Sequence, residues 1–294
     1  MSATSPFKNP FETEGRWYKA NLHTHTLTSD GENSLYERVC QYRDEGYSIL
    51  AITDHDRTND ISSVSSEDFL VISGIETHPV CPDSEPYHLV CLNVPHGFDC
   101  SNEPDPNLRI RMVKDVGGEV IMAHPYWCGH NLTHLSRIHG AIALEVYNAT
   151  CTKIGKGFSS VHWDDLLDAG IILPAVAVDD THRGRDIFMG WIWVKAQSLT
   201  LDAVLEALRT GCFYSSCGPV IETAVIQDNK IILKCSPVAE VHFIAQRSHG
   251  LSIYGDGRLL TDLECQVRDS WEYLRIEVVD IHGNHAWTNP LIVK

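Results

Sequence analysis

The sequence lacks any apolar run long enough to cross a membrane, and residues 1–17 contain no apolar core of the kind that a secretory signal needs. These two absences predict a protein without a membrane anchor. Hydrophobic residues make up 43% of the chain and charged residues 21%, which is typical of a globular protein rather than a disordered one. We therefore expect a cytoplasmic protein with a full hydrophobic core.

Basic residues are also scarce. The chain has 23 lysines and arginines against 39 aspartates and glutamates, and its formal net charge at pH 7 is −16. Proteins that bind duplex nucleic acid usually present clustered lysine and arginine to the phosphate backbone. The charge balance therefore predicts that duplex DNA is not a partner.

Paired cysteines are absent as well. The ten cysteines are scattered, without a C-x-x-C motif, in a chain of 294 residues that is too long to need a disulfide framework. They are predicted to be reduced thiols. The sequence also contains no G-x-S-x-G elbow, no phosphate-binding P-loop and no dinucleotide-binding fingerprint, so nothing points to the chemistries that these motifs serve.

Short apolar runs, separated by helical or turn-rich segments, dominate residues 18–182. This alternation is typical of an α/β protein with a largely parallel sheet, and seven or eight strands suit a barrel. The runs lie at residues 18–23, 48–55, 69–76, 88–94, 119–124, 141–148 and 171–180, with 190–196 as an additional strand. Helices are predicted over 34–45, 105–116, 158–168 and 201–209, and Ser34 and Glu37 predict a capping box for the first.

From residue 212 the pattern changes to strict alternation of apolar and polar residues, with turn-forming residues between the segments. This pattern predicts a small all-β subdomain, similar to a β-sandwich, over residues 212–294. The first domain then covers residues 16–211, and the boundary falls near Gly211. Because the second segment is short, we expect it to pack tightly on the first domain.

Histidine is frequent and unevenly placed. Twelve of the 16 histidines lie between His23 and His182. His23 and His25 come at the end of an apolar run with one residue between them, and residues two apart in a strand share a face. Both imidazoles can therefore reach one metal ion, although an H-x-H pair by itself is as typical of a protein surface as of a metal site.

Several further apolar runs end in side chains that bind metals. One ends in Asp54, His55 and Asp56, the next in Glu76, another in His124, and the last in Asp179, Asp180 and His182. In a parallel barrel the carboxyl ends of the strands share one rim, where such folds build their active sites. The sequence thus predicts a metal centre at this rim, and the spacing leaves open whether Asp179 or Asp180 takes part.

These residues resemble the motifs of the PHP (polymerase and histidinol phosphatase) family of metal-dependent phosphoesterases. In order, they are His-Thr-His with Ser-Asp-Gly at 23–31, Thr-Asp-His-Asp at 53–56, Ala-His-Pro at 123–125 and Asp-Asp-Thr-His at 179–182. The resemblance covers residues 16–185. It implies a distorted seven-stranded β/α barrel that holds two or three divalent metal ions.

The resemblance also implies which residues are ligands. His23, His25 and Asp180 would hold one ion, Glu76 would bridge it to a second ion bound by His88 and His124, and Asp30, His55 and His182 would hold a third. The family's Asp-x-His motif favours Asp180 over Asp179. Histidine and carboxylate ligands suit zinc, manganese or iron.

His88 is the exception among these ligands, because it precedes its apolar run instead of following it. Its place at the rim requires that strand to run antiparallel. The link of residues 77–87 contains three prolines and is too short for a helical crossover, so we expect the strand to return antiparallel and to start at the same rim.

The reaction that the resemblance implies is hydrolysis of small phosphate mono- or diesters by a hydroxide that bridges two ions. His182 and Asp56 are candidates for proton transfer to the leaving group. Arg183 and Arg185 are candidates for binding the phosphate, although they are equally typical of a surface turn. The expected partner is then a small-molecule phosphate ester.

Four further residues are candidates for roles beside the expected metal ligands. Glu145 and Asn148 end a predicted strand and are candidates for hydrogen bonds to the ligands. Tyr126 and Trp127, directly after His124, are candidates for an aromatic wall beside the substrate or for ordinary buried packing.

Two alternative functions stay open. Residues 143–148, 209–219 and 286–294 resemble the branch of the family named for carbaryl hydrolases, which implies carbamic or carboxylic esters as substrates. The second alternative is a non-catalytic domain in which the metal only stabilises the fold. The sequence indicates neither the natural substrate nor the oligomeric state.

Overall fold

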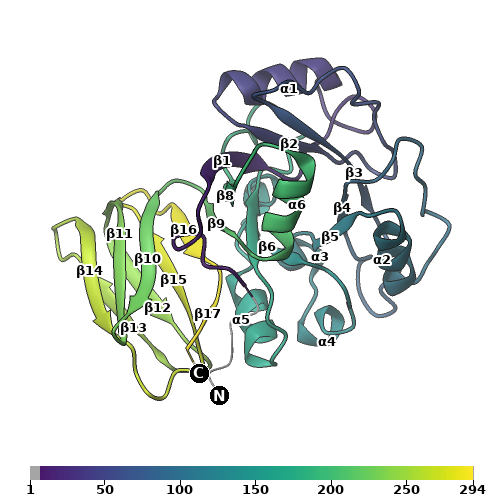
Figure 1. Cartoon of the computed structure of the whole chain (residues 1–294). Coiled ribbons are helices and arrows are strands. Elements are labelled where there is room, and N and C mark those ends of the chain that lie inside the picture. Colours follow the sequence, from purple (N-terminus) through teal and green to yellow (C-terminus); the bar gives the residue numbers. More distant parts are fainter. Residues whose placement is uncertain (1–6, 294) are drawn as a thin grey trace.

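The computed structural model describes residues 7–293 and has a mixed α/β architecture, in which a large sheet continues into an antiparallel β region (Figure 1). The strands of the first part are β1 (Arg16–Asn21), β2 (Ile49–Ile52), β3 (Leu70–Thr77), β4 (Leu89–Leu92), β5 (Glu119–Met122), β6 (Ala143–Asn148), β7 (Ala175–Val178), β8 (Trp191–Ala196) and β9 (Phe213–Ser216). The helices are α1 (Leu35–Asp44), α2 (Pro106–Asp115), α3 (Pro125–Cys128), α4 (Leu132–Leu135), the 3-10 helix η1 (Thr150–Ile154), α5 (Ser160–Asp168) and α6 (Leu201–Arg209). The predicted α/β class is confirmed.

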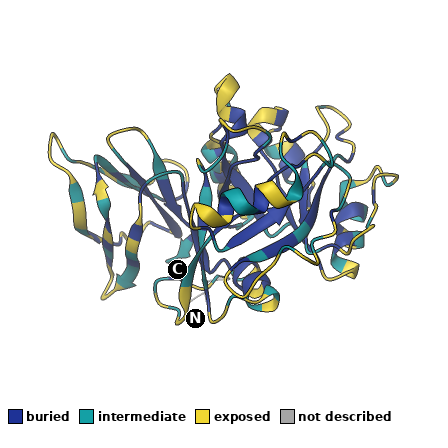
Figure 2. Cartoon of the chain, turned by 90° about the horizontal axis from the view of Figure 1, so that it is seen from above, coloured by how far each residue is buried: buried dark blue, intermediate teal, exposed yellow. Residues whose placement is uncertain are grey.

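Two helices begin where the sequence supplies capping residues. The Ser34 hydroxyl accepts a hydrogen bond from the backbone N–H of Glu37, and the Glu37 carboxylate accepts one from the N–H of Ser34, which is the predicted capping box of α1. Asp105 caps α2, ahead of Pro106 at the first helical position. Buried residues gather in the central strands, and exposed residues gather on the surrounding helices and loops (Figure 2).

The sheet runs parallel on both sides of one reversed strand. β1, β2 and β3 pair in parallel, as do β5, β6 and β7. β4 lies between β3 and β5 and is antiparallel to both, so the predicted reversal after residue 77 is confirmed. The carboxyl ends of the parallel strands and the amino end of β4 therefore share one edge.

The segments that follow β1 and β7 lie side by side at this edge. The N–H of Asp180 donates to the carbonyl of His23 (3.0 Å), and the N–H of His25 donates to the carbonyl of Thr181 (2.9 Å). Thr24 and Thr181 form a parallel β-bridge. These bonds join the last strand of the parallel set to the first and hold the two ends of the site together.

β8 and β9 continue the large sheet antiparallel and connect it to the C-terminal β region. The remaining strands are β10 (Ile221–Gln227), β11 (Lys230–Val238), β12 (Glu240–Ile244), β13 (Gly250–Tyr254), β14 (Leu260–Gln266), β15 (Tyr273–Val279), β16 (His285–Thr288) and β17 (Leu291–Ile292). A second sheet of β10, β11 and β14 shares an apolar core with β12 and β15. Hydrogen-bonded strands, rather than a free linker, thus join the two regions.

Two findings concern the absences noted in the sequence. No helix within residues 7–293 is both long enough and apolar enough to cross a membrane. None of the ten cysteines, all within residues 7–293, forms a disulfide.

Candidate metal centre

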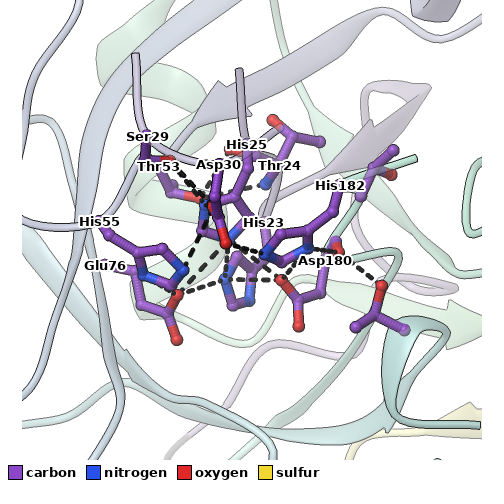
Figure 3. Close-up of polar contacts among 12 residues, drawn as sticks. His23, Thr24, His25, Ser29, Asp30, Thr53, His55, Glu76, Asp180 and His182 are labelled. Atoms are coloured by element: carbon purple, nitrogen blue, oxygen red, sulfur yellow. Dashed lines mark hydrogen bonds and ion pairs between the residues drawn. The ribbon is translucent and has the colours of Figure 1, made fainter. Parts of the chain in front are cut away.

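The strand ends bring histidine and carboxylate side chains into one cluster (Figure 3). His23, His25 and Asp30 follow β1, His55 follows β2, Glu76 lies in β3, His88 precedes β4, His124 follows β5, and Asp180 and His182 follow β7. These are all the residues that the family resemblance implies as ligands, and each belongs to at least one group whose potential ligand atoms lie within 4.8 Å of one another.

The Glu76 carboxylate occupies the middle of the cluster. Its Oε2 lies 3.0 Å from His55 Nδ1, 3.3 Å from His23 Nε2 and 3.4 Å from His25 Nε2. Its Oε1 lies 2.6 Å from His88 Nδ1 and 3.2 Å from His124 Nε2. The two oxygens thus face different sets of imidazoles, which is the arrangement that a bridging carboxylate requires.

Asp180 is a second carboxylate inside the cluster. Its Oδ1 lies 3.1 Å from His25 Nε2, 3.3 Å from His23 Nε2 and 3.5 Å from His182 Nδ1. The His182 Nδ1 also lies 2.8 Å from the Asp180 carbonyl, to which it donates, so Nε2 is the imidazole nitrogen left with a lone pair.

The neighbouring Asp179 faces a different environment. Its buried carboxylate accepts hydrogen bonds from the hydroxyl of Tyr42 and from the backbone N–H groups of Phe188, Met189 and Gly190. Burial raises the pKa of Asp179 to about 6, against the effect of these bonds. The structure therefore brings Asp180, and not Asp179, to the cluster.

Asp30 forms the outer part of the cluster. Its carboxylate lies 3.5 Å from His55 Nε2 and 3.4 Å from His182 Nε2. The Asp30 side chain is 55% exposed, whereas that of Glu76 is 1% exposed, so the cluster opens to solvent at Asp30.

The chemistry of the cluster fits divalent metal ions. Glu76 Oε2, Asp180 Oδ1 and His55 Nδ1 are buried and make no hydrogen bond, although polar groups surround them. An unsatisfied buried polar atom costs ~1–3 kcal/mol, and more when it is charged. A cation bound among these atoms would remove this cost, and the mixture of imidazole nitrogen and carboxylate oxygen suits zinc, manganese or iron.

The backbone is strained at three of the strand ends. Asp56 has a φ of 48°, His124 of 23° and Asp180 of 55°, which lie in the left-handed region that non-glycine residues rarely adopt. Such conformations cost ~1–3 kcal/mol each and gather at functional sites. The strain at these three positions agrees with a functional site at this edge of the sheet.

Glu145, in β6, links two of the candidate ligands. Its Oε1 lies 2.7 Å from His23 Nδ1, and its Oε2 accepts hydrogen bonds from the backbone N–H of His124 and from Asn148 Nδ2, both at 2.9 Å. Asn148 Nδ2 also lies 3.2 Å from Asp180 Oδ2. Glu145 therefore fixes the His23 ring so that Nε2 faces the centre of the cluster.

Replacing Glu145 by glutamine is expected to weaken metal binding about 10- to 100-fold. Glutamine offers only one acceptor oxygen, so its amide group must face either the N–H of His124 or the protonated Nδ1 of His23, and both are donors. Titration of the metal-free variant with zinc or manganese in a calorimeter measures the effect. An unchanged dissociation constant would show that Glu145 does not orient His23.

The neighbouring carboxylates also raise the pKa of His23. Burial by itself lowers the pKa of His23, but the carboxylates of Asp180 and Glu145 outweigh it, and the net pKa lies well above its ordinary value. In the metal-free protein the carboxylates thus favour the protonated form of His23.

Metal binding is expected to release at least one proton at pH 7 and to weaken as the pH falls, because only neutral imidazole binds a metal. The measurement is calorimetric titration with zinc in two buffers that differ in ionisation enthalpy. Identical heats in both buffers would contradict the raised pKa of His23.

Asp56, a predicted proton donor, lies beside a histidine that the sequence analysis does not single out. Its Oδ2 is 3.3 Å from His78 Nδ1. The His78 ring centroid lies 4.9 Å from that of His55 and 4.3 Å from that of His88, and its Nε2 is 4.0 Å from Glu76 Oε2. His78 follows Glu76 by two residues, the spacing of the H-x-H pair. Because residues two apart in a strand share a face, this spacing predicts that His78 lies on the same side as Glu76.

The two predicted phosphate-binding arginines are not brought to the cluster. Both Arg183 and Arg185 are exposed, and neither lines the cavity at the cluster. Arg183 Nε lies 3.5 Å from a carboxylate oxygen of Glu32, and its backbone N–H donates to Asp186 (2.8 Å). The buried Asp186 therefore fixes this turn, and the arginine side chain meets an acid on the surface.

The cluster lines a cavity of about 220 Å³. Its walls are Asp30, His55, Glu76, His88, His124, Trp127, Thr150, Cys151, Lys153, Asp180 and His182. Lys153 is the basic residue that lines it, and nothing in the sequence distinguishes this lysine from other loop lysines. The volume lies below the ~300–1,000 Å³ of typical pockets for drug-sized ligands, so the cavity suits a small ligand.

No protein-family model matches the sequence, and no curated protein matches it significantly. Among solved structures, one similar fold is a two-domain protein from Bacteroides vulgatus that contains a predicted PHP-like metal-dependent phosphoesterase. The two are 14% identical, the alignment covers 99% of this chain and 100% of that one, and the TM-score is 0.54. A protein from Bifidobacterium adolescentis, named as a metal-dependent phosphoesterase, is 18% identical over 67% of this chain and 98% of its own, with a TM-score of 0.46. The first comparison shows a similar fold over the whole length of this chain.

Proposed function

We propose that this chain, whose fold is PHP-like, is a metal-dependent hydrolase of small phosphate mono- or diesters, built on a distorted barrel of strands β1–β7. The observation that carries the proposal is the cluster around Glu76, where all the implied ligands meet and three buried polar atoms lack a hydrogen bond. The whole-length similarity to a two-domain protein with a PHP-like part supports the fold on which the proposal rests.

The residues divide into three sets toward the ions. We assign His23, His25 and Asp180 to one ion, Glu76, His88 and His124 to the second, and Asp30, His55 and His182 to the third. The ligand atoms of each set lie within 4.8 Å of one another. When bound, divalent ions supply Lewis acidity, which polarises a phosphoryl oxygen and lowers the pKa of water to ~7. We expect zinc, manganese or iron, in two or three copies.

The chain's own groups arrange charge and protons around the ions. His182 donates its Nδ1 proton to the Asp180 carbonyl, which supports a ligand role for its Nε2 rather than the role of proton donor. Three carboxylates, those of Glu76, Asp180 and Asp30, balance part of the charge of the ions. Lys153 adds a positive charge at the cavity wall, which supports an anionic substrate despite the net charge of −16.

Release of nitrophenol tests the reaction, because one chromophore reports three ester classes. Protein reconstituted with manganese or zinc is assayed on nitrophenyl phosphate, bis-nitrophenyl phosphate and a nitrophenyl carbamate, with His25→Ala as the inactive variant. We expect turnover of a phosphate ester that disappears in His25→Ala. Turnover of the carbamate alone would replace the proposal with an ester hydrolase, and metal-dependent stability without any turnover would replace it with a metal-stabilised module.

A further inference from the structure

Four side chains line the cavity without belonging to the proposed ligands. They are Trp127, Thr150, Cys151 and Lys153. Whatever part of a substrate lies beside the metal centre must touch these side chains, because the remaining walls are ligands. Their chemistry therefore indicates the chemistry of the group that the phosphate is attached to.

Trp127 is fixed in position by the candidate ligands. It lies in α3, three residues after His124, and its backbone N–H donates to the His124 carbonyl at 2.9 Å. Its ring makes edge contacts with the rings of His88 and His124, at interplanar angles of 66° and 77° and centroid distances of 5.4 and 5.3 Å. The side chain nevertheless stays 37% exposed. An immobilised aromatic surface is therefore presented to the cavity, beside two proposed ligands.

Lys153 supplies a free cation to the same cavity. It lies in η1, whose first residues are tied to two strand ends. The Thr150 hydroxyl donates to the carbonyl of Asp180, which follows β7, at 2.8 Å, and the Cys151 N–H donates to Oδ1 of Asn148, at the end of β6, at 3.0 Å. Lys153 is exposed, and within residues 7–293 no acidic side chain lies within ion-pair distance of it. The ammonium group is therefore available to an anion in the cavity.

The other two side chains add no competing recognition group. The hydroxyl of Thr150 is already engaged with the Asp180 carbonyl and the Asp186 carboxylate, and Cys151 is a small, buried side chain. Apart from the proposed ligands, the cavity thus offers one flat aromatic surface, one cation and two small side chains. Tryptophan favours flat rings through stacking, and lysine favours the oxygens of a phosphate.

We propose that this subsite selects phosphate esters whose alcohol half carries a single flat ring, with the ring stacked on Trp127 and the phosphoryl oxygens near Lys153. The cavity of about 220 Å³ has room for one ring and a phosphate. In the reaction, the oxygen of water bonds to phosphorus, the bond from phosphorus to the alcohol oxygen breaks, and one proton of the water ends on that oxygen. The inference rests on the proposed function and extends it to a substrate class.

Binding of non-hydrolysable phosphonates tests the subsite separately from turnover. Calorimetric titration of the metal-loaded protein compares phenylphosphonate with methylphosphonate, after the metal content of each variant has been measured. We expect the wild type to bind phenylphosphonate about tenfold more tightly, as ~1–3 kcal/mol of stacking on an aromatic side chain predicts. In Trp127→Ala the two dissociation constants should become nearly equal, and Trp127→Phe should retain a preference for the phenyl compound. Lys153→Gln should raise the dissociation constants of both compounds by a similar factor.

Neighbouring residues supply matched controls. Tyr126 is an exposed aromatic residue next to Trp127, Lys156 is a lysine three residues after Lys153, and neither lines the cavity. Tyr126→Ala and Lys156→Gln should leave both dissociation constants unchanged. A phenyl preference that survives in Trp127→Ala, or that is lost equally in Tyr126→Ala, would overturn the inference. If the preference depends on Trp127 while no phosphate ester is hydrolysed, the proposed reaction fails and the subsite stands.

Discussion

Glu76→Gln is expected to lower kcat/KM for a phosphate ester by about a thousandfold or more. The Glu76 carboxylate faces five imidazoles within 3.4 Å, and both of its oxygens take part. An amide of the same shape is neutral and a poor metal ligand. Losing a metal ion that this carboxylate would hold removes several kcal/mol of transition-state stabilisation, and each 1.36 kcal/mol is a factor of ten in rate.

The matched control is Glu67→Gln, because Glu67 is exposed and lies just before β3, at the opposite end of the strand from Glu76. Initial rates and far-ultraviolet circular dichroism are measured for both variants, together with their metal content. We expect Glu67→Gln to match the wild type and Glu76→Gln to keep its fold while losing activity. Activity of Glu76→Gln within tenfold of the wild type would rule out a bridging role for this carboxylate.

Arg275→Met is expected to lower the free energy of unfolding by about 3–5 kcal/mol. Arg275 is 1% exposed and joins β15 to α5: its guanidinium donates two hydrogen bonds of 2.6 Å to Asp164 and one of 2.8 Å to Glu277. It also lies over the Trp163 ring, 4.9 Å from the centroid. Methionine fills the space but removes the cation that Glu277 and Asp164 share, so that Glu277 keeps only its contact with His285. The loss of this cation from two carboxylates is the main source of the destabilisation.

Chemical denaturation measures this loss, and Arg258→Met, which changes an exposed arginine of the same β region, is the control. A loss below 1 kcal/mol in Arg275→Met would contradict the claim that the ion pairs of Arg275 stabilise the contact between β15 and α5.

The same network predicts a pH dependence. Although burial opposes it, His285 and Arg275 lower the pKa of Glu277 to about 2, from an ordinary value of 4.5. A depressed carboxyl pKa stabilises the fold above the unfolded-state value, and this contribution is lost as the pH falls from 4.5 toward 2. We expect the wild type to lose more stability across this interval than Glu277→Gln. Equal losses would show that Glu277 does not contribute.

The position of the cluster was predictable from the sequence because strand ends obey simple geometry. Polar residues such as His55 and Glu76 interrupt apolar runs, and parallel strands must end at one edge. Even the reversed strand behind His88 could be predicted, since its link is too short for a crossover. Spacing alone does not show which of Asp179 and Asp180 faces the cluster. The difference depends on the hydrogen bonds that Tyr42 and the backbone of residues 188–190 donate to Asp179.

Residues on loops were less predictable. The course of a loop depends on side-chain bonds to its backbone, such as that of Asp186 to the N–H of Arg183, and a sequence pattern carries no such information. The predicted arginines therefore lie outside the cavity, and Lys153 lines it instead. The all-β pattern of residues 212–294 does not locate strands β13 and β14, because most of their residues are exposed or half-exposed and their hydrophobic alternation is weak.

The metal content of the purified chain is the most direct test of the central claim that the strand-end cluster is a metal centre. Wild type, His25→Ala and His96→Ala are loaded with zinc or manganese, dialysed against metal-free buffer and analysed by mass spectrometry. His96 is exposed and lies outside the cluster, so it controls for the loss of any histidine. We expect two or three ions per chain in the wild type and in His96→Ala, and fewer in His25→Ala. Wild-type protein without bound metal, or equal content in His25→Ala, would contradict the claim.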